Sequence, residues 1–518
     1  MEQITYMLNT FYKKNNLGRF LIAGIIATTL MKLFLMGDGF LAFPDEWRYT
    51  ASGHVLKEIQ AGNLKEAVKI VFSTQGRPMD TAIKIIPNGM QYISARLMGL
   101  EYYESANSYP LFFFNFIIFC LTLIVQFKFS HLILKNFNLS LFSVLMFGCL
   151  LNSCIYLRHG LPYDTSFLIL YFIFYKVLKN SILKNYSFLK SFFFGFFVFA
   201  GYLAYPGYFA LAASIGLFFF LHDLNKENAI GRIKFSSAYI GGSLSCLLVF
   251  ELISRLAGTS YINSLQELSG TLNQGSFEEC FTFIFKYLLA VEKASGILLI
   301  SGLAGFTVLC FQKKSLKAEN TFILLFSILI LIFLMFAGTG YFLHKSVMNG
   351  RFLHQFFPFL CLLFAYLHAA AKNKKAALIF VGSFSLIFII NFTAGLIGYQ
   401  KFSYPRDVAW RHYRKYNPKK VSDYCEMKNS WTVLPITEVE LKKFKYKATD
   451  RQIIIVNSCS IFPFKKETYS EFRPSNSQKE IFSRPSYINF KGYQLEGNSI
   501  EERSWIDLLN LPIKVFIE

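Results

Sequence analysis

Long apolar runs alternate with short polar stretches along the chain up to residue 400. Each run contains roughly 17 to 22 mostly apolar residues, the length that an α-helix needs to cross a bilayer. The first run follows Lys13, Lys14 and Arg19 but has no small-residue cleavage site, so we interpret it as a membrane helix and not as a signal peptide. The pattern predicts eleven transmembrane helices, near residues 20–37, 109–127, 139–157, 163–178, 188–205, 207–222, 236–254, 294–311, 320–337, 353–371 and 376–397.

The Lys and Arg side chains between these runs gather in alternate loops. Such residues are concentrated in cytoplasmic loops of membrane proteins, so the alternation predicts the orientation of the chain. An odd number of spans with a cytoplasmic N-terminus places everything after residue 400 on the outer side of the membrane. The loops expected in the cytoplasm carry Lys13, Lys14, Arg19, Lys128, Lys135, Lys226, Arg232, Lys234, Lys313, Lys314, Lys317, Lys372, Lys374 and Lys375, together with the segment 176–190.

The overall composition agrees with this assignment. Of the 518 residues, 53% are hydrophobic and 16% are charged, which is too apolar for a soluble globular protein. The net charge of +21 does not indicate a nucleic-acid partner, because the basic residues lie in short loops and form no single basic stripe. The nine cysteines include no CxxC pair and no zinc-like spacing. The expected fold class is mainly α: a polytopic membrane helix bundle.

Two regions outside the apolar runs are long enough to hold structure. Residues 38–108 form the predicted first external loop, and its amphipathic stretches 54–69 and 79–98 either cap the bundle at the membrane interface or shape a substrate site. We therefore divide the chain into a membrane domain, 1–399, and a C-terminal domain, 400–518. The C-terminal domain contains a strand-like Gln-Ile-Ile-Ile-Val at 452–456, which predicts a small α/β or α+β domain outside the cytoplasm.

Cys425 and Cys459 both lie in the C-terminal domain. An oxidising periplasm would permit a disulfide between them, but their pairing does not follow from the sequence.

Candidate chemistry first occurs just after the first apolar run, in Phe-Pro-Asp-Glu-Trp-Arg-Tyr at 43–49. A carboxylate at a membrane face, Asp45 or Glu46, can act as a general base toward an acceptor hydroxyl or amine, with Arg48 beside it. Asp is also a favoured N-cap and Glu a favoured first-turn residue, and the residues alone favour this capping interpretation. Arg77, in the turn 75–78, adds a further candidate cation in the same loop.

A second polar group lies in the external turn 156–165, directly against two predicted spans. Ionisable residues at such positions are costly and usually face a cavity or a partner. The guanidinium of Arg158 suits either a structural ion pair with Asp164 or a substrate phosphate, and both interpretations stay open. His159 lies in the same turn.

A third group lies in the external segment 340–358, which holds His344, Lys345 and Arg351. Cationic side chains are uncommon in the external loops of membrane proteins, so their presence in this segment requires an explanation. Binding the phosphate of a lipid-linked substrate supplies one, and contact with lipid headgroups supplies another.

Taken together, these residues resemble the GT-C superfamily of membrane glycosyltransferases, which use polyprenyl-phosphate-linked sugars. The resemblance is carried by Pro-Asp-Glu at 44–46 followed by Tyr49, by the turn 158–165, and by Gly-Arg-Phe-Leu at 350–353 continuing to Pro358. It covers the membrane part of the chain. An architecture with a soluble C-terminal domain is similar to that of the lipid A aminoarabinose transferases and the protein mannosyltransferases.

The resemblance implies roles for individual residues. Asp45 would be the catalytic base, with Glu46 as a substitute or a metal ligand, and Arg351 would lie near the donor phosphate. The His344-Lys345 pair is similar to a His-Lys-x-x-Arg-Phe pattern of lipid-linked mannosyltransferases, although three extra residues intervene here. Divalent metal use varies in the superfamily, and without an Asp-x-Asp motif the metal requirement stays open.

The implied reaction moves a hexosyl or pentosyl group from a polyprenyl-phosphate-linked sugar to an envelope glycan, lipid or protein acceptor. It would take place at the outer face of a bacterial inner membrane, with the lipid bilayer as the other partner. Two alternatives remain: an O-antigen polymerase or ligase, and a transporter of lipid-linked saccharides without chemistry. A transporter would place charged residues within the bilayer and often contains repeated halves, and no repeat is visible in the sequence.

Overall fold

The computed structural model places most of the apolar runs and a small part of the C-terminal domain. The structure describes residues 16–36, 52–73, 84–85, 89–90, 93, 97, 109–154, 157, 163–183, 185–220, 229–270, 280–311, 320–343, 350–369, 374–401, 411–412, 415–416, 418–423, 449–457, 472–484 and 513–518.

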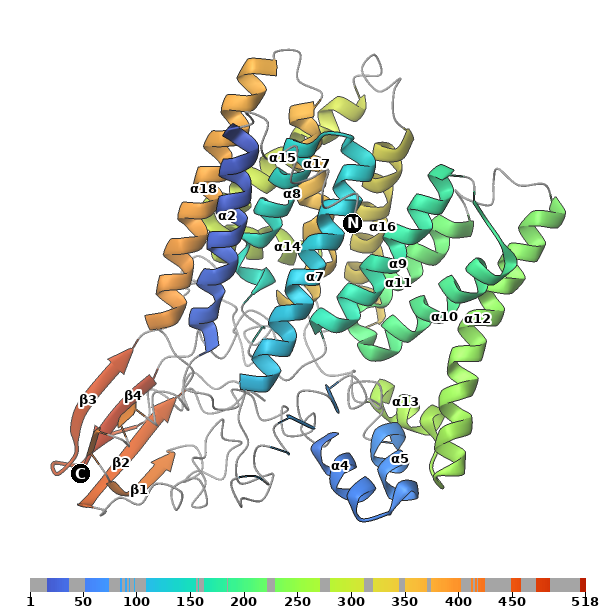
Figure 1. Ribbon diagram of the computed structural model, residues 1–518. Helices are drawn as coiled ribbons and strands as arrows, with labels where there is room; N and C mark the ends of the chain where they lie inside the picture. Colours follow the sequence, from blue (N-terminus) through green and yellow to red (C-terminus); the bar gives the residue numbers. More distant parts are fainter. Residues whose placement is uncertain are drawn as a thin grey trace.

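The described part of the membrane domain is helical (Figure 1). Short 3₁₀ or π segments adjoin several of the helices. The elements are α2 (Asn16–Met31), η1 (Lys32–Met36), α4 (Ser52–Gln60), α5 (Leu64–Ser73), α7 (Tyr109–Leu134), α8 (Phe137–Gly148), η3 (Leu151–Ser153), α9 (Tyr163–Leu183), α10 (Phe188–Ala204), η4 (Pro206–Tyr208), α11 (Phe209–Phe218), α12 (Ala229–Leu256), α13 (Tyr261–Gly270), α14 (Phe283–Tyr287), η7 (Leu288–Glu292), α15 (Lys293–Phe311), α16 (Asn320–Leu343), η9 (Gly350–Gln355), α17 (Phe357–Ala369) and α18 (Lys374–Lys401).

Each of the eleven predicted apolar runs overlaps one of these helices. Among the described residues, six helices are long and apolar enough to cross a membrane, namely Asn16–Met36, Tyr109–Leu134, Tyr163–Leu183, Ala229–Leu256, Leu325–Leu343 and Lys375–Ile397. Four further apolar helices, Phe137–Gly148, Phe188–Ala204, Pro206–Phe218 and Phe357–His368, are shorter. The chain is thus a membrane protein, and the count of eleven crossings stays a prediction.

Two of the predicted runs differ from the structure in their continuity. The run 139–157 is not one helix, because α8 ends at Gly148 and the 3₁₀ segment η3 follows at Leu151. The run 353–371 begins with the 3₁₀ segment η9, and α17 starts only at Phe357. Both irregular segments lie in the same region of the bundle, because η3 contacts η9.

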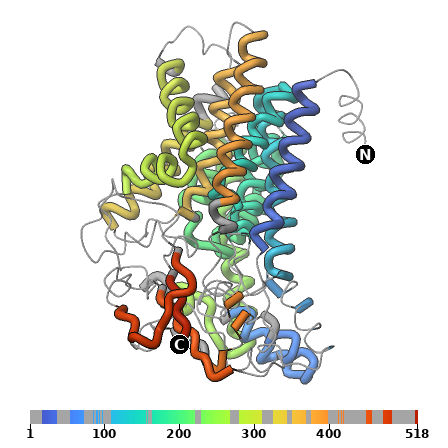
Figure 2. Tube along the Cα trace, turned by 90° about the vertical axis from the view of Figure 1, so that its left-hand side faces the viewer, coloured from blue at the N-terminus to red at the C-terminus, as the bar shows by residue number. Residues whose placement is uncertain are grey.

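The helices run side by side, with α18 against α2 along one side of the bundle (Figure 1). The amphipathic pair α4 and α5 and the C-terminal sheet lie at the same end of the bundle in both views (Figures 1 and 2). We call this end the sheet end. On the other side, α10 and α12 cross so closely that a Cβ added at Gly195 would lie 1.9 Å from the carbonyl oxygen of Tyr239.

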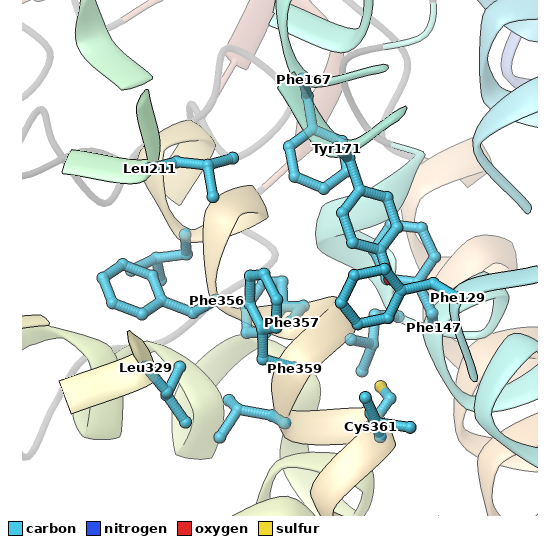
Figure 3. Packing of buried hydrophobic residues seen from close by; sticks show 14 of the residues in the cluster. Phe129, Phe147, Phe167, Tyr171, Leu211, Leu329, Phe356, Phe357, Phe359 and Cys361 are labelled. Atoms are coloured by element: carbon cyan, nitrogen blue, oxygen red, sulfur yellow. The ribbon is translucent and has the colours of Figure 1, made fainter. Parts of the chain in front are cut away.

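Aromatic side chains fill the centre of the bundle, and α17 is surrounded by them (Figure 3). Phe359 of α17 packs against Phe129 of α7 and Tyr171 of α9, with ring centroids 6.1 and 6.0 Å apart. Phe356 lies on the other side, near Leu211 and Leu329 (Figure 3). Apolar burial of this kind gives α17 a fixed position at the centre of the bundle.

The C-terminal domain contains a four-stranded sheet of order β1-β2-β4-β3. Its strands are β1 (Pro418–Asp423), β2 (Thr449–Asn457), β3 (Lys479–Arg484) and β4 (Ile513–Ile517). The predicted strand 452–456 forms the centre of β2, which pairs parallel with β1 and antiparallel with β4. Residues 453–456 of β2 are all buried. The predicted strand is confirmed as part of a small C-terminal sheet, while the α/β or α+β class of the domain stays a prediction. Cys425 and Cys459 lie outside the described residues.

Candidate functional site

Most of the residues that the sequence singled out lie outside the described part of the chain. These are Asp45, Glu46, Arg48, Arg77, Arg158, His159, His344 and Lys345. Arg351 is the second residue of η9, and the structure describes its backbone. Asp164 is described with its side chain. The described part of the candidate site consists of Asp164, η9 and the polar side chains that contact them.

The break between α8 and η3 is the first element of this site. Lys32, at the start of η1, is fully buried, and its Nζ donates to the carbonyl oxygen of Gly148 at 2.7 Å and of Thr28 at 3.2 Å. The ammonium group also lies 4.9 Å from the ring centroid of Phe119 and 4.3 Å from that of Phe392. A cation at a helix C-terminus satisfies free carbonyls and matches the helix dipole, so Lys32 stabilises the end of α8.

Glu292 satisfies the other side of the same break. Its carboxylate is fully buried and accepts from the backbone N–H of Leu151 at 2.9 Å and of Asn152 at 2.8 Å. Glu292 ends the π segment η7, and the next residue, Lys293, has φ +48°, a conformation that residues other than glycine rarely adopt. Backbone strain and π segments of this kind often occur at functional sites.

Asn152, held in this way by its backbone, lies at the junction of three elements. Its Nδ2 donates to the hydroxyl of Tyr287 at 2.8 Å and to the carbonyl oxygen of Gly350 at 2.7 Å. Its Oδ1 contacts Nδ1 of His354. One buried amide thus connects η3, the end of α14 and both ends of η9.

Asp164 and His354 bring together two of the three polar segments of the sequence. Oδ1 of Asp164, in the first turn of α9, lies 3.3 Å from Nε2 of His354, and both side chains are buried. The interpretation of Asp164 as a partner of Arg158 stays a prediction, because Arg158 is outside the described residues. Gln355 adds a further contact for η9, accepting from the N–H of Leu211 at 3.2 Å.

A further buried contact holds the turn before α9 on α7. Nδ2 of Asn115 donates to the carbonyl oxygen of Leu157 at 3.0 Å, and Oδ1 of Asn115 accepts from the buried Nζ of Lys84 at 2.6 Å. Asn115 of α7 therefore links Lys84, in the loop predicted to be external, to Leu157. We refer to Lys32, Asn152, Asp164, Tyr287, Glu292 and His354 as the polar cluster.

An apolar groove of about 200 Å³ adjoins the polar cluster. It lies between α14, η7, α15, α16 and α17, and Thr307, the polar side chain among its described lining residues, donates to the carbonyl of Leu303. Phe285 and Ile330 line the groove and are 38% and 41% exposed, so it reaches the outer surface of the bundle. The lining includes Leu288, Leu299, Leu303, Leu329, Phe333 and Phe356.

The groove and the polar cluster share their supporting elements. Leu288 lines the groove, and its neighbour Tyr287 belongs to the polar cluster. Phe356 lines the groove two residues after His354. The groove and the polar cluster are therefore neighbours at Tyr287–Leu288 and at His354–Phe356.

Sequence reasoning selected Asp164 and the segment that contains His354, but it missed Lys32, Asn152, Glu292 and Tyr287. A signal was available, because Lys32 and Glu292 lie within or beside apolar runs, where ionisable side chains are costly and mark functional sites. Among the described residues, no group of three or more His, Cys, Asp or Glu side chains is arranged to hold a metal ion.

Comparison with known proteins adds no assignment: no protein-family model matches the chain, and no curated protein matches it.

Proposed function

We propose that this protein is a membrane glycosyltransferase of the GT-C type. It transfers a sugar from a polyprenyl-phosphate-linked donor to an envelope glycan, lipid or protein acceptor at the extracytoplasmic face of a bacterial inner membrane. The observation that carries the proposal is the position of the apolar groove directly beside the polar cluster, with Tyr287–Leu288 and His354–Phe356 contributing to both. A donor with a long isoprenoid tail and a charged head requires such a pair of neighbouring surfaces.

The proposed chemistry has three parts. A base takes the proton of the acceptor hydroxyl or amine, and Asp45 is the candidate. Cations stabilise the polyprenyl phosphate that leaves, and Arg351, Lys345 and Arg158 are the candidates. The groove holds the lipid tail, so that the anomeric carbon lies near η9.

The meeting of Asp164 with His354 supports this arrangement. Arg158 and Lys345 flank these two residues in the sequence, and the backbone of Arg351 belongs to the same 3₁₀ segment as His354. α9, which follows Arg158 in the chain, contacts η9, which contains the backbone of Arg351. In the proposed topology, this region lies on the periplasmic side.

The proposal is tested with the full-length protein in lipid nanodiscs. Polyprenyl-phosphate-linked hexose and pentose donors are supplied with an envelope extract, and the release of polyprenyl phosphate is measured together with the labelled product. Transfer that is lost in Asp45→Asn and weakened by a higher donor KM in Arg351→Ala supports the assignment. Equal transfer by Asp45→Asn would remove Asp45 as the base.

A transporter of lipid-linked saccharides is the second candidate, and one observation favours it. Lys32 and Glu292 are fully buried charged residues at a broken helix, which is the arrangement found at the substrate sites of many transporters. The same assay separates the two functions, because a transporter would move the donor between leaflets without releasing polyprenyl phosphate.

A further inference from the structure

The amide of Asn152 has only one orientation that satisfies its neighbours. The carbonyl oxygen of Gly350 can only accept a hydrogen bond, so the atom of Asn152 that lies 2.7 Å from it must be the nitrogen. The same nitrogen donates to the hydroxyl of Tyr287. The amide oxygen therefore faces Nδ1 of His354.

This orientation determines the state of the imidazole. An amide oxygen can only accept, so Nδ1 of His354 carries a hydrogen and donates it to Asn152. The Nε2 atom then faces Oδ1 of Asp164 at 3.3 Å. Nε2 is therefore the ring nitrogen that contacts the carboxyl group of Asp164.

We propose that Asn152 is a positioning residue that fixes His354 as the Nδ1-protonated tautomer. His354 can then bind Asp164 through Nε2, which holds η9 on the first turn of α9. The consequence for sugar transfer rests on the proposed function. η9 contains the backbone of Arg351, so Asn152 determines the position from which the Arg351 side chain extends.

The position of Asn152 is itself set by hydrogen bonds on both sides of the helix break. Glu292 accepts from its backbone N–H, and Lys32 binds the carbonyl of Gly148 at the end of the preceding helix. An uninterrupted helix through 149–152 would use these N–H groups internally, and the side chain of Asn152 would turn elsewhere. The helix break therefore places the side-chain amide of Asn152 beside His354.

Histidine NMR of the full-length protein, labelled on its imidazole nitrogens and held in nanodiscs, tests the proposal without reference to activity. For His354, assigned by its loss in His354→Gln, we expect a protonated Nδ1. In Asn152→Leu, which removes the acceptor of this proton, we expect the His354 signals to shift while the other seven histidines keep theirs. A His354 that carries its proton on Nε2 alone in the unmutated protein would overturn the proposal.

Asn391→Leu is the matched control. Asn391 donates to the backbone carbonyl of Glu292 at 2.9 Å and to Ser295 at 3.1 Å, so its loss disturbs the same region without contact to His354. We expect this variant to keep the His354 signals. If both variants shift them equally, the role of Asn152 is general packing and the proposal fails. Glu292→Gln, which gives up one of the two carboxylate contacts, serves as the second test where Asn152→Leu does not fold.

The transfer assay distinguishes a failure of the proposed function from a failure of the positioning role of Asn152. A misplaced η9 lowers kcat by up to roughly a hundredfold while the tail still binds the groove, so donor KM should change little in Asn152→Leu. A wild-type protein that releases no polyprenyl phosphate but has the expected His354 tautomer contradicts the proposed function alone. Normal kcat in a folded Asn152→Leu variant of an active enzyme contradicts the positioning role alone.

Discussion

Asp164 and His354 lie far apart in the chain, yet Oδ1 of Asp164 is 3.3 Å from Nε2 of His354 in the interior of the bundle. The pair joins the first turn of α9 to η9, and the second nitrogen of His354 contacts Asn152. Asp164 also lies at a helix N-terminus, where a carboxylate is favoured by the helix dipole. One buried contact thus connects two polar segments that the sequence presents separately.

Removing the carboxylate should destabilise the protein more than replacing it by its isosteric amide. In Asp164→Ala, His354 loses the group that faces Nε2, and we expect a loss of about 3 kcal/mol in unfolding free energy. In Asp164→Asn, the amide can still donate to Nε2, so the loss should stay below about 1.5 kcal/mol. Denaturant unfolding followed by circular dichroism measures both. Equal losses in the two variants would contradict a hydrogen bond between the side chain at position 164 and Nε2 of His354.

Filling the groove should weaken binding of the donor tail. Leu329 lines the groove and is buried, so Leu329→Trp occupies space that the tail requires. We expect donor KM to rise by about tenfold, which corresponds to about 1.4 kcal/mol, without a matching fall in kcat. Leu334→Trp on the same helix is the control, because Leu334 is 52% exposed and is not among the groove residues. An identical KM in both variants would argue against the groove as the tail site.

Lys32 should tolerate loss of its charge but not its reversal. Lys32→Met gives up hydrogen bonds to two carbonyl oxygens but also avoids burying an ammonium group, so we expect the unfolding free energy to change by less than about 2 kcal/mol. Lys32→Glu would place a carboxylate against the same oxygens and the faces of Phe119 and Phe392, and should abolish folding. Size-exclusion chromatography and thermal unfolding distinguish these outcomes. A well-folded Lys32→Glu protein would contradict the described environment.

The crossing of α10 and α12 should require glycine at position 195. An added Cβ there would lie 1.9 Å from the backbone oxygen of Tyr239, which cannot move away as a side chain can. We expect Gly195→Ala to lower the unfolding free energy by at least about 2 kcal/mol. At Gly241, on α12, a Cβ meets nothing within 4 Å, so Gly241→Ala should leave stability unchanged or raise it by up to about 1 kcal/mol. Similar effects of the two changes would contradict the close approach.

The C-terminal domain should lose stability in mild acid because of His412. Burial, together with the nearby Lys415 and Arg411, lowers the pKa of His412, whose ring packs against Phe482 of β3. As the pH falls below about 6.5, the unfolded chain takes up a proton before the folded domain does, so the unfolded state is favoured. Stability is therefore full above this pH and declines below it.

Hydrogen exchange of β2 and β3 peptides at about pH 7.5 and about pH 5.5 measures this effect. His412→Phe keeps an aromatic ring but cannot titrate, so we expect it to lose less protection in acid than the unmutated protein at the same pH. An identical acid response in the two proteins would remove His412 as its source.

The helices of the membrane domain and the central strand of the C-terminal sheet could be predicted from the sequence. A run of apolar residues long enough to cross a bilayer must form a helix, because its backbone groups have no other partners there. A different local signal, a short run of β-branched residues followed by the turn residues Asn457 and Ser458, predicts the strand at 452–456, and residues 453–456 of β2 are buried. These are local properties, and neighbouring residues in the chain suffice to decide them.

The site depends instead on contacts between distant residues. The run 139–157 is as apolar as an ordinary spanning helix, and it breaks because Lys32 and Glu292 bind the backbone on either side of Cys149, across 116 and 140 positions of the chain. Their side chains make the broken form stable, since each satisfies backbone groups that an intact helix would satisfy internally. The sequence by itself therefore determined a membrane helix bundle with candidate acids and cations, and only the tertiary structure decided that Asn152, His354 and Asp164 meet beside an apolar groove.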